Sequence, residues 1–245
     1  MVGHDQPRIP CVNIKLCLRQ ILGQHPRHWP TLWATHARLW RQRKTLKAHR
    51  NHYRQQMQGG KWAKDWFTRH IPIWLSAINQ PATTRLNILE IGAYEGLCSR
   101  FLLWHFTRAQ LTCVDTFAGS HEDGPNSPRS TLEKRFDHNL KAFSKRLRKL
   151  KGDSRVLVPQ LHAEHFNLIY IDGYHHSHYV MVDALNAWQL LKVGGVMIFD
   201  DYGWQFADYP PHHRPRGAID HFLPLIKGDY RLLHVGYQLL LQRVR

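Results

Sequence analysis

The chain has 245 residues, enough for one α/β domain of about 100 to 200 residues and a modest extension. Its four cysteines, Cys11, Cys17, Cys98 and Cys113, show neither CxxC spacing nor the density of a disulfide-rich secreted domain, which favours a reducing cytoplasmic location. No apolar stretch approaches the roughly 18 residues of a spanning helix, and the start lacks a signal-peptide pattern. We therefore expect a soluble protein.

The net charge of +16 is unevenly distributed along the chain. Residues 1–85 contain 15 Lys and Arg against two acids, Asp5 and Asp65, which gives +13 and leaves only +3 for the other 160 residues. This asymmetry suggests that the N-terminal part meets an anionic partner, such as nucleic acid, a membrane surface or a phosphorylated substrate. The alternative is a solvated basic surface.

The N-terminal part is predicted to be helical. Apolar residues recur at roughly helical spacing over residues 31–56, with Lys and Arg between them, which predicts one basic amphipathic helix. After Gly59 and Gly60, residues 62–78 are apolar enough to dock on the domain that follows. We place a basic helical extension over residues 1–80 and the catalytic domain over residues 81–245. The extension could also mediate a homodimer or cover the acceptor pocket, and its tryptophans could form core contacts or an aromatic platform for nucleic acid.

From residue 86 onward, short apolar runs alternate with helical stretches, the pattern of parallel strands joined by crossover helices. The predicted strands are residues 87–91, 111–115, a short one ending near Gly152, 167–172 and 196–200. The predicted helices are residues 97–106, 131–150 and 179–191. Ser130 and Glu133 suggest a capping box, and Gly194 with Gly195 suggests the end of the last helix. Residues 230–244 are predicted to form two more strands, which gives a Rossmann-like, mostly parallel seven-stranded sheet with an antiparallel C-terminal strand.

The end of the first predicted strand carries a glycine turn typical of a nucleotide site, because glycines let the backbone approach a bound nucleoside. The turn has GxxxG spacing and runs through Gly92, Ala93, Tyr94, Glu95 and Gly96. Carboxylates here, with Glu90 before them, would repel a pyrophosphate but suit the ammonium and sulfonium groups of S-adenosylmethionine.

Acidic residues follow the next two predicted strands. Asp115 ends the second strand, where a carboxylate can accept hydrogen bonds from ribose hydroxyls. Asp153 and Ser154 follow the third strand and could border an adenine ring. Taken singly, each acid could be a solvated strand-end cap, but their order along the chain favours a nucleoside site.

Three further carboxylates, Asp172, Asp200 and Asp201, follow the fourth and fifth predicted strands. Like charges at one sheet edge are unfavourable unless a cation is present, and oxygen ligands favour magnesium or calcium over zinc. The alternative is that one aspartate pairs with an arginine and the others cap helices. The histidine-rich stretches lack a standard zinc-ligand spacing.

The stretch 89–96 and the segment 152–161 resemble the catechol O-methyltransferase group. The segments around Asp172 and Asp200 resemble the family called methyltransferase domain 24, which includes magnesium-dependent sugar O-methyltransferases. The resemblance implies the class I fold of methyltransferases that use S-adenosylmethionine, and it does not reach the first 80 residues. It implies cofactor contacts by Glu90, Gly92, Ala93, Tyr94, Glu95, Gly96, Ser99, Asp115, Thr116, Asp153, Ser154 and Asp172. It also implies a metal, most simply Mg²⁺, bound by Asp172, Asp200 and Asp201.

The chain departs from the sugar O-methyltransferases at the general base. Those enzymes carry an aspartate two residues after the first metal ligand, where this chain has Tyr174, followed by His175. With an unperturbed pKa of about 6.5, a histidine can accept a proton at neutral pH. His175 is therefore the predicted catalytic base beside Asp172, with His176 and His178 as alternatives.

Further residues are candidates for the acceptor side. The loop 119–129 could close over the site, and Trp204 and Tyr209 could line the acceptor pocket or pack in the core. The predicted reaction is methyl transfer to a hydroxyl of a small molecule, sugar or glycan. The alternatives are an RNA methyltransferase that uses the basic extension, and an inactive domain that serves as a binding module.

Overall fold

The computed structural model describes residue 18 and residues 21–119, 129–205 and 210–245. Cys11, Cys17, Tyr209 and nearly all of the predicted closing loop lie outside these residues, whereas Cys98 and Cys113 are buried free thiols. Among the described residues, no helix is both long and apolar enough to cross a membrane.

A seven-stranded sheet with the order β3-β2-β1-β4-β5-β7-β6 forms the centre of the fold. Strands β1 to β5 pair in parallel, and β7 pairs antiparallel with β5 and β6. The predicted α/β fold is confirmed. The strands are β1 (Asn87–Ile91), β2 (Gln110–Asp115), β3 (Leu147–Lys151), β4 (Phe166–Ile171), β5 (Leu191–Phe199), β6 (Tyr230–Val235) and β7 (Leu239–Arg243).

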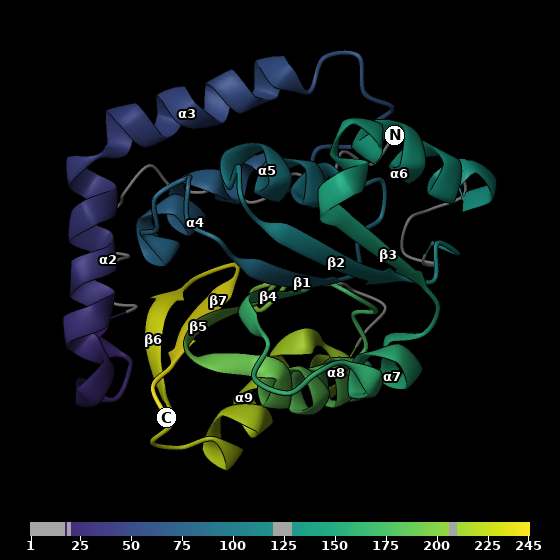
Figure 1. The fold of residues 1–245 in the computed structure, drawn as a ribbon. Coiled ribbons are helices and arrows are strands. Elements are labelled where there is room, and N and C mark those ends of the chain that lie inside the picture. Colours follow the sequence, from purple (N-terminus) through teal and green to yellow (C-terminus); the bar gives the residue numbers. More distant parts are fainter. Residues whose placement is uncertain (1–17, 19–20, 120–128, 206–209) are drawn as a thin grey trace.

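Helices cover both faces of the sheet (Figure 1), and consecutive residues of strands β1 and β4 are accordingly buried along nearly their whole length. One face carries α4 (Ile71–Ile78), α5 (Leu97–His105) and α6 (Leu132–Leu140), and the other carries α7 (Ser154–Leu157), α8 (Ser177–Leu190) and α9 (Pro215–Leu225). Short 3-10 helices span Pro26–His28, Thr68–His70, Arg129–Thr131, Lys141–Arg146, Val158–Gln160 and Pro211–His213.

The prediction of one helix over residues 31–56 is wrong. The structure has two helices, α2 (Trp29–Arg41) and α3 (Arg43–Gln56), which meet at Gln42 and run in different directions (Figure 1). Long-range contacts decide the break: Thr31 donates to the Leu232 carbonyl of β6 at 2.7 Å, whereas the Tyr53 hydroxyl donates to the Leu97 carbonyl of α5 at 2.7 Å. Helix α2 therefore packs against β6, whereas α3 packs against α5.

Two predicted helix ends also need correction. The helix expected over residues 131–150 ends at Leu140, and a 3-10 helix and strand β3 occupy the rest of that range. Ser130 does not cap it, since the N-cap is Thr131 without a side-chain hydrogen bond, and Glu133 instead pairs with Lys149 and Lys151. Gly194 and Gly195 lie within β5, because α8 has already ended at Leu190.

Candidate active site

A cavity of about 390 Å³ lies beyond the carboxyl ends of the parallel strands, where open α/β sheets bind their ligands. It brings together predicted site residues from the ends of five different strands. The predicted site residues that line it are Glu90, Gly92, Ala93, Tyr94, Glu95, Asp115, Thr116, Asp153, Ser154, Asp172, His175 and Asp200. Gly96, Ser99 and Asp201 lie outside this lining.

The glycine turn after β1 holds the backbone close to the end of β4. Gly92 has a φ of +84°, and a Cβ added there would lie 1.9 Å from the Asp172 carbonyl oxygen. Gly96 has a φ of +81°, and its Cβ would lie 2.3 Å from a methyl carbon of Leu140 on α6. Both glycines are therefore required by a left-handed backbone and a close approach. Gly92 fixes the floor of the cavity, and Gly96 packs α5 against α6.

Glu90 is a buried acid at the end of β1. Its Oε2 accepts hydrogen bonds from Ser99 and, at 3.2 Å, from the Cys113 thiol. Its Oε1 is buried and has no hydrogen-bond partner among the described residues. Burial raises the pKa of Glu90 to about 7. An acid with an unpartnered buried oxygen fits a cationic ligand group. Ser99 does not line the cavity itself but donates a hydrogen bond to Glu90, which does.

Glu95 lines the cavity but is already engaged on both oxygens. Oε1 pairs with Arg135, and Oε2 accepts a hydrogen bond from the Ala63 amide at 2.6 Å. Glu95 therefore fastens the segment before α4 to the wall of the cavity. Its direct contact with a cofactor stays a prediction.

The Asp115 carboxylate is held in place by backbone amides. Oδ2 accepts from the amides of Ala93 and Tyr94 at 2.7 and 2.8 Å, and Oδ1 accepts from Phe117 at 2.6 Å. These bonds tie the glycine turn to the end of β2. Oδ2 already accepts two of these bonds, and the contact of this carboxylate with ribose hydroxyls stays a prediction.

Beyond β3, the wall of the cavity contains an acid that sequence reasoning missed. Asp153 caps α7 and pairs with Arg155. Asp183 of α8 is 2% exposed, accepts a hydrogen bond from Ser154, and keeps Oδ1 without a partner among the described residues. Burial raises the pKa of Asp183 to about 6. No local motif marks this residue, since it lies inside a helix.

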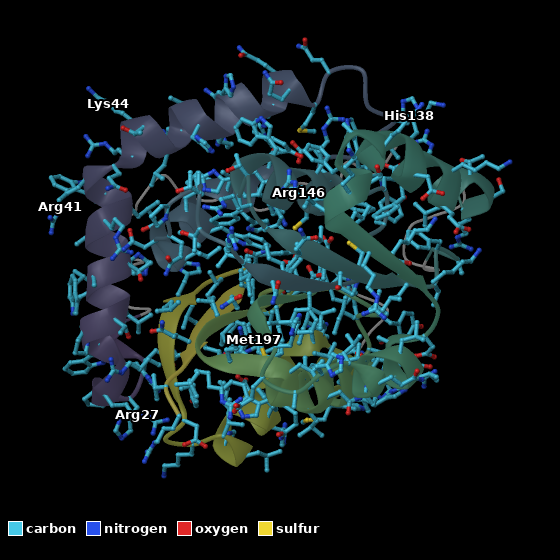
Figure 2. All side chains as sticks on the ribbon, viewed as in Figure 1. Arg27, Arg41, Lys44, His138, Arg146 and Met197 are labelled. Carbon is cyan, nitrogen blue, oxygen red and sulfur yellow. The ribbon has the colours of Figure 1, made fainter. Side chains whose placement is uncertain are left out.

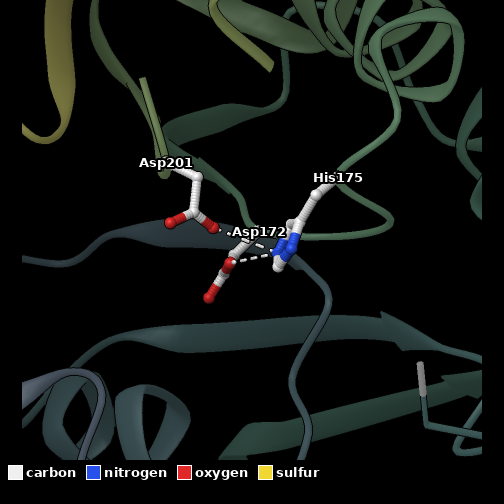
Figure 3. Close-up of side chains that lie close together, drawn as sticks. All are labelled: Asp172, His175 and Asp201. Atoms are coloured by element: carbon white, nitrogen blue, oxygen red, sulfur yellow. Dashed lines mark ion pairs between the residues drawn. The ribbon is translucent and has the colours of Figure 1, made fainter. Parts of the chain in front are cut away.

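Asp172, His175 and Asp201 converge at the ends of β4 and β5 (Figure 3). His175 Nε2 lies 3.0 Å from Asp201 Oδ2 and 3.6 Å from Asp172 Oδ1. One ligand atom from each residue lies within 4.8 Å of the others. Burial, followed by repulsion from Asp200, raises the pKa of Asp172 well above its usual range, and burial raises that of Asp201 to about 6.

Two carboxylate oxygens and an imidazole nitrogen are a donor set that fits a divalent ion. A cation there would also relieve the repulsion between Asp172 and its neighbour Asp200. The structure therefore fits the predicted metal near Asp172 and Asp201, with His175 as an additional candidate ligand.

Asp200 is near the cluster of Asp172, His175 and Asp201 but makes different contacts. Its Oδ2 accepts a hydrogen bond from the buried Tyr170 hydroxyl, which also lies 2.8 Å from Asp172 Oδ2, and its Oδ1 accepts from the Asp201 amide at 2.8 Å. A phenol has one proton, so it can donate to only one of the two carboxylates at a time. Sequence reasoning missed Tyr170, although the two-residue period of a strand places it on the same side as Asp172.

Aromatic side chains surround the predicted base. The Trp204 ring lies 5.2 Å from the His175 ring, and Tyr174 lines the cavity with its ring 4.8 Å from that of Tyr179. Trp204 is thus next to the candidate base, as an acceptor-pocket residue would be, but it is not among the residues that line the cavity.

The N-terminal extension also contributes to the site, although the sequence did not identify which of its residues would do so. Lys64, Trp66 and Phe67 line the cavity. The Trp66 ring lies 5.3 Å from that of Tyr94, and the Lys64 ammonium lies 5.1 Å from the Trp66 ring. The backbone bond between Ala63 and Glu95 holds this segment beside the glycine turn. No pattern within residues 61–68 points to this role, because it depends on a contact across the fold.

Comparison with known proteins gives a family match for the segment that builds the site. Residues 89–202 match a family model described as a methyltransferase domain. None of the curated proteins matches this chain.

Several solved structures share the fold. The MycE methyltransferase of the mycinamycin biosynthetic pathway, in complex with Mg, SAH and mycinamycin VI, is 17% identical with a TM-score of 0.54 over 74% of this chain and 51% of that chain. This chain thus spans about half the length of that protein. The SAH-bound methyltransferase PaMTH1 of Podospora anserina is 18% identical with a TM-score of 0.51, over 82% and 88% of the two chains. The cofactor-bound Rv0187 from MTB is 16% identical with a TM-score of 0.54, over 97% and 98%. The predicted class I methyltransferase fold is confirmed.

Proposed function

We propose that this chain, whose residues 89–202 match the methyltransferase domain model, transfers a methyl group from S-adenosylmethionine to a hydroxyl group of a small-molecule or sugar acceptor. One observation carries the proposal: a single cavity at the carboxyl edge of the sheet joins a buried acid, Glu90, to Asp115 and Asp172. MycE, whose fold is similar, binds SAH, Mg and mycinamycin VI, which supports both the cofactor and a small-molecule acceptor.

In this proposal the cofactor lies along the ends of β1, β2 and β3. The unpartnered oxygen of Glu90 receives the ammonium group, Asp115 receives the ribose hydroxyls, and Ser154 borders the adenine. The carboxylate lining is unsuited to a dinucleotide, since a pyrophosphate would be repelled by Glu90.

Replacing Asp115 tests whether this carboxylate binds the ribose of the cofactor or only holds the glycine turn in place. We expect Asp115→Ala to weaken binding of S-adenosylhomocysteine by at least about tenfold, because a charged acceptor of two hydroxyls is lost. Calorimetric titration measures the affinity, and NAD, which should not bind the wild-type chain, is the control ligand. Unchanged affinity in a folded Asp115→Ala variant would contradict the assignment.

Lys64 is the proposed partner of the cofactor's carboxylate. Apart from Lys64, the only Lys or Arg among the lining residues is Arg155, which is paired with Asp153. Lys64 follows Ala63, which is bonded to Glu95 of the glycine turn, and it lines the same cavity as Glu90, so the amino-acid end of the cofactor would meet both charges.

We expect Lys64→Met to weaken binding of S-adenosylhomocysteine by about tenfold and to leave binding of 5′-methylthioadenosine, which lacks the amino-acid group, within about twofold. Lys61→Met is the matched control, because Lys61 is exposed nearby and does not line the cavity. Equal losses for both ligands would instead indicate a general change in the shape of the cavity.

The methyl transfer itself is an in-line displacement. The acceptor oxygen attacks the methyl carbon, the bond from that carbon to sulfur breaks, and the acceptor proton leaves to a base. In this proposal His175 accepts the proton, and the nearby Asp201 and Asp172 would stabilise the imidazolium that forms. The effect of the site is mainly to hold the two reactants in line.

A divalent ion is the second element of the proposal. Asp172, Asp201 and His175 would hold it, and it would lower the pKa of an acceptor hydroxyl bound beside them. Held in this way, His175 would be a ligand rather than the base. Removing bound metal with a chelator distinguishes the two roles: activity that survives chelation but is lost in His175→Ala assigns the base.

We expect Asp201→Asn to abolish Mn²⁺ binding, measured by electron paramagnetic resonance, and to leave affinity for S-adenosylhomocysteine within a few fold. The reason is that Asp201 belongs to the ligand group but does not line the cofactor cavity. Glu164→Gln, which alters an exposed acid far from the group, is the control. Retention of a stoichiometric Mn²⁺ signal in Asp201→Asn would contradict the assigned ligand.

A further inference from the structure

The outer side of α2 and α3 carries a concentrated positive charge. Residues 21–64 contain no Asp or Glu, so no acid within this segment offsets its lysines and arginines. Figure 2 shows Arg41 and Lys44 on the outer side of the two helices, where α2 meets α3. Five exposed residues of α2 and α3 form a surface that we call the basic arm face: Trp33, Trp40, Arg41, Arg43 and Lys44.

Large apolar side chains accompany this charge. Trp33 and Trp40 are 45% and 52% exposed. They are seven residues apart, which is two helical turns, so both lie along one side of α2. The exposed large apolar residues outside the N-terminal helices occur singly on separate elements, namely Val156, Leu185, Val193 and Leu225. Paired exposed tryptophans are costly in water and indicate a contact surface.

The shape of the surface favours a bilayer over a nucleic acid. Single-stranded nucleic acid binds in grooves where aromatic faces are open for stacking. Here the two tryptophans lie on the outside of a helix, and the Arg43 guanidinium is 5.2 Å from the centre of the Trp40 ring, over one of its faces. Tryptophan beside arginine and lysine is the composition of helices that lie in the headgroup region of an anionic membrane.

We propose that the basic arm face binds the surface of a bilayer that contains anionic phospholipids. The two tryptophans would enter the headgroup region, and Arg41, Arg43 and Lys44 would contact lipid phosphates. None of the five residues lines the cavity, so this inference stands independently of the proposed methyl transfer. It gives the N-terminal charge a partner without a membrane-spanning helix.

Cosedimentation of the full chain with vesicles tests the proposal. We expect binding to vesicles of phosphatidylcholine mixed with an equal part of phosphatidylglycerol to be at least about tenfold tighter than binding to phosphatidylcholine alone, and to weaken with salt. Trp33→Gln combined with Trp40→Gln should weaken binding to the anionic vesicles by about tenfold, as should Arg41→Gln combined with Lys44→Gln.

Two exposed lysines outside the basic arm face, in the 3-10 helix Lys141–Arg146, provide the matched control. Lys141→Gln combined with Lys145→Gln removes the same charge and should leave vesicle binding within about twofold. All variants should retain the thermal unfolding midpoint of the wild-type chain. The proposal is overturned if anionic vesicles do not bind, if the tryptophan variant binds as tightly as the wild type, or if a short single-stranded RNA displaces the chain from vesicles at the same ionic strength.

Discussion

Gly92→Ala should destabilise the chain by roughly 3 to 5 kcal/mol, because two penalties combine at one residue. The first is the left-handed backbone at φ +84°, and the second is a Cβ placed 1.9 Å from the Asp172 carbonyl oxygen. That oxygen belongs to the backbone that follows β4, so it cannot move without displacing the side chain of Asp172. We expect a lower midpoint in urea unfolding and the loss of measurable S-adenosylhomocysteine binding.

Gly59→Ala separates the two penalties. Gly59 has nearly the same φ, +87°, but nothing lies within 4 Å of its added Cβ. This variant should cost only about 1 kcal/mol and should keep its ligand affinity. If both variants lose the same stability, the close approach between the ends of β1 and β4 does not constrain the site as described.

The strand ends of the site could be predicted from sequence because their information is local. Glu90, Asp115, Asp172 and Asp200 each follow a short apolar run, and parallel strands bring such positions to one edge. The residues that approach the same cavity from elsewhere have no such signal. Lys64 reaches it only because the Ala63 amide bonds to Glu95, and Asp183 reaches it from within a helix.

The errors in the predicted elements have the same origin. A continuous helical pattern over residues 31–56 says nothing of the bend at Gln42, which follows from the separate contacts of Thr31 with β6 and of Tyr53 with α5. Gly194 and Gly195 suggested a helix end, but strand β5 already begins at Leu191, and the two glycines lie in an irregularity between its pairings with β4 at Leu191 and at Val196. Tertiary contacts outweigh local propensity at these positions.

Replacing His234 by Phe should remove about 2 kcal/mol of the stability change between pH 7 and pH 5. Burial, followed by the nearby His36 and His70, lowers the pKa of His234 to about 3. Since a histidine in the unfolded chain has a pKa near 6.5, the unfolded state binds the proton first. Stability from neutral His234 is therefore complete above pH 6.5 and is lost progressively as the pH falls toward 3.

The comparison must use the difference between variants, because other buried groups act in the opposite direction. The raised pKa values of Glu90 and Asp201 mean that the folded state takes up protons more readily, which adds stability on acidification. Urea unfolding of the wild type and of His234→Phe at both pH values isolates the contribution of His234 to the change in the free energy of unfolding. The exposed His138 (Figure 2) provides the control, since His138→Phe should change the difference by less than about 0.5 kcal/mol. If His234→Phe and the wild type lose the same stability between pH 7 and pH 5, His234 is not held neutral by its burial beneath α2.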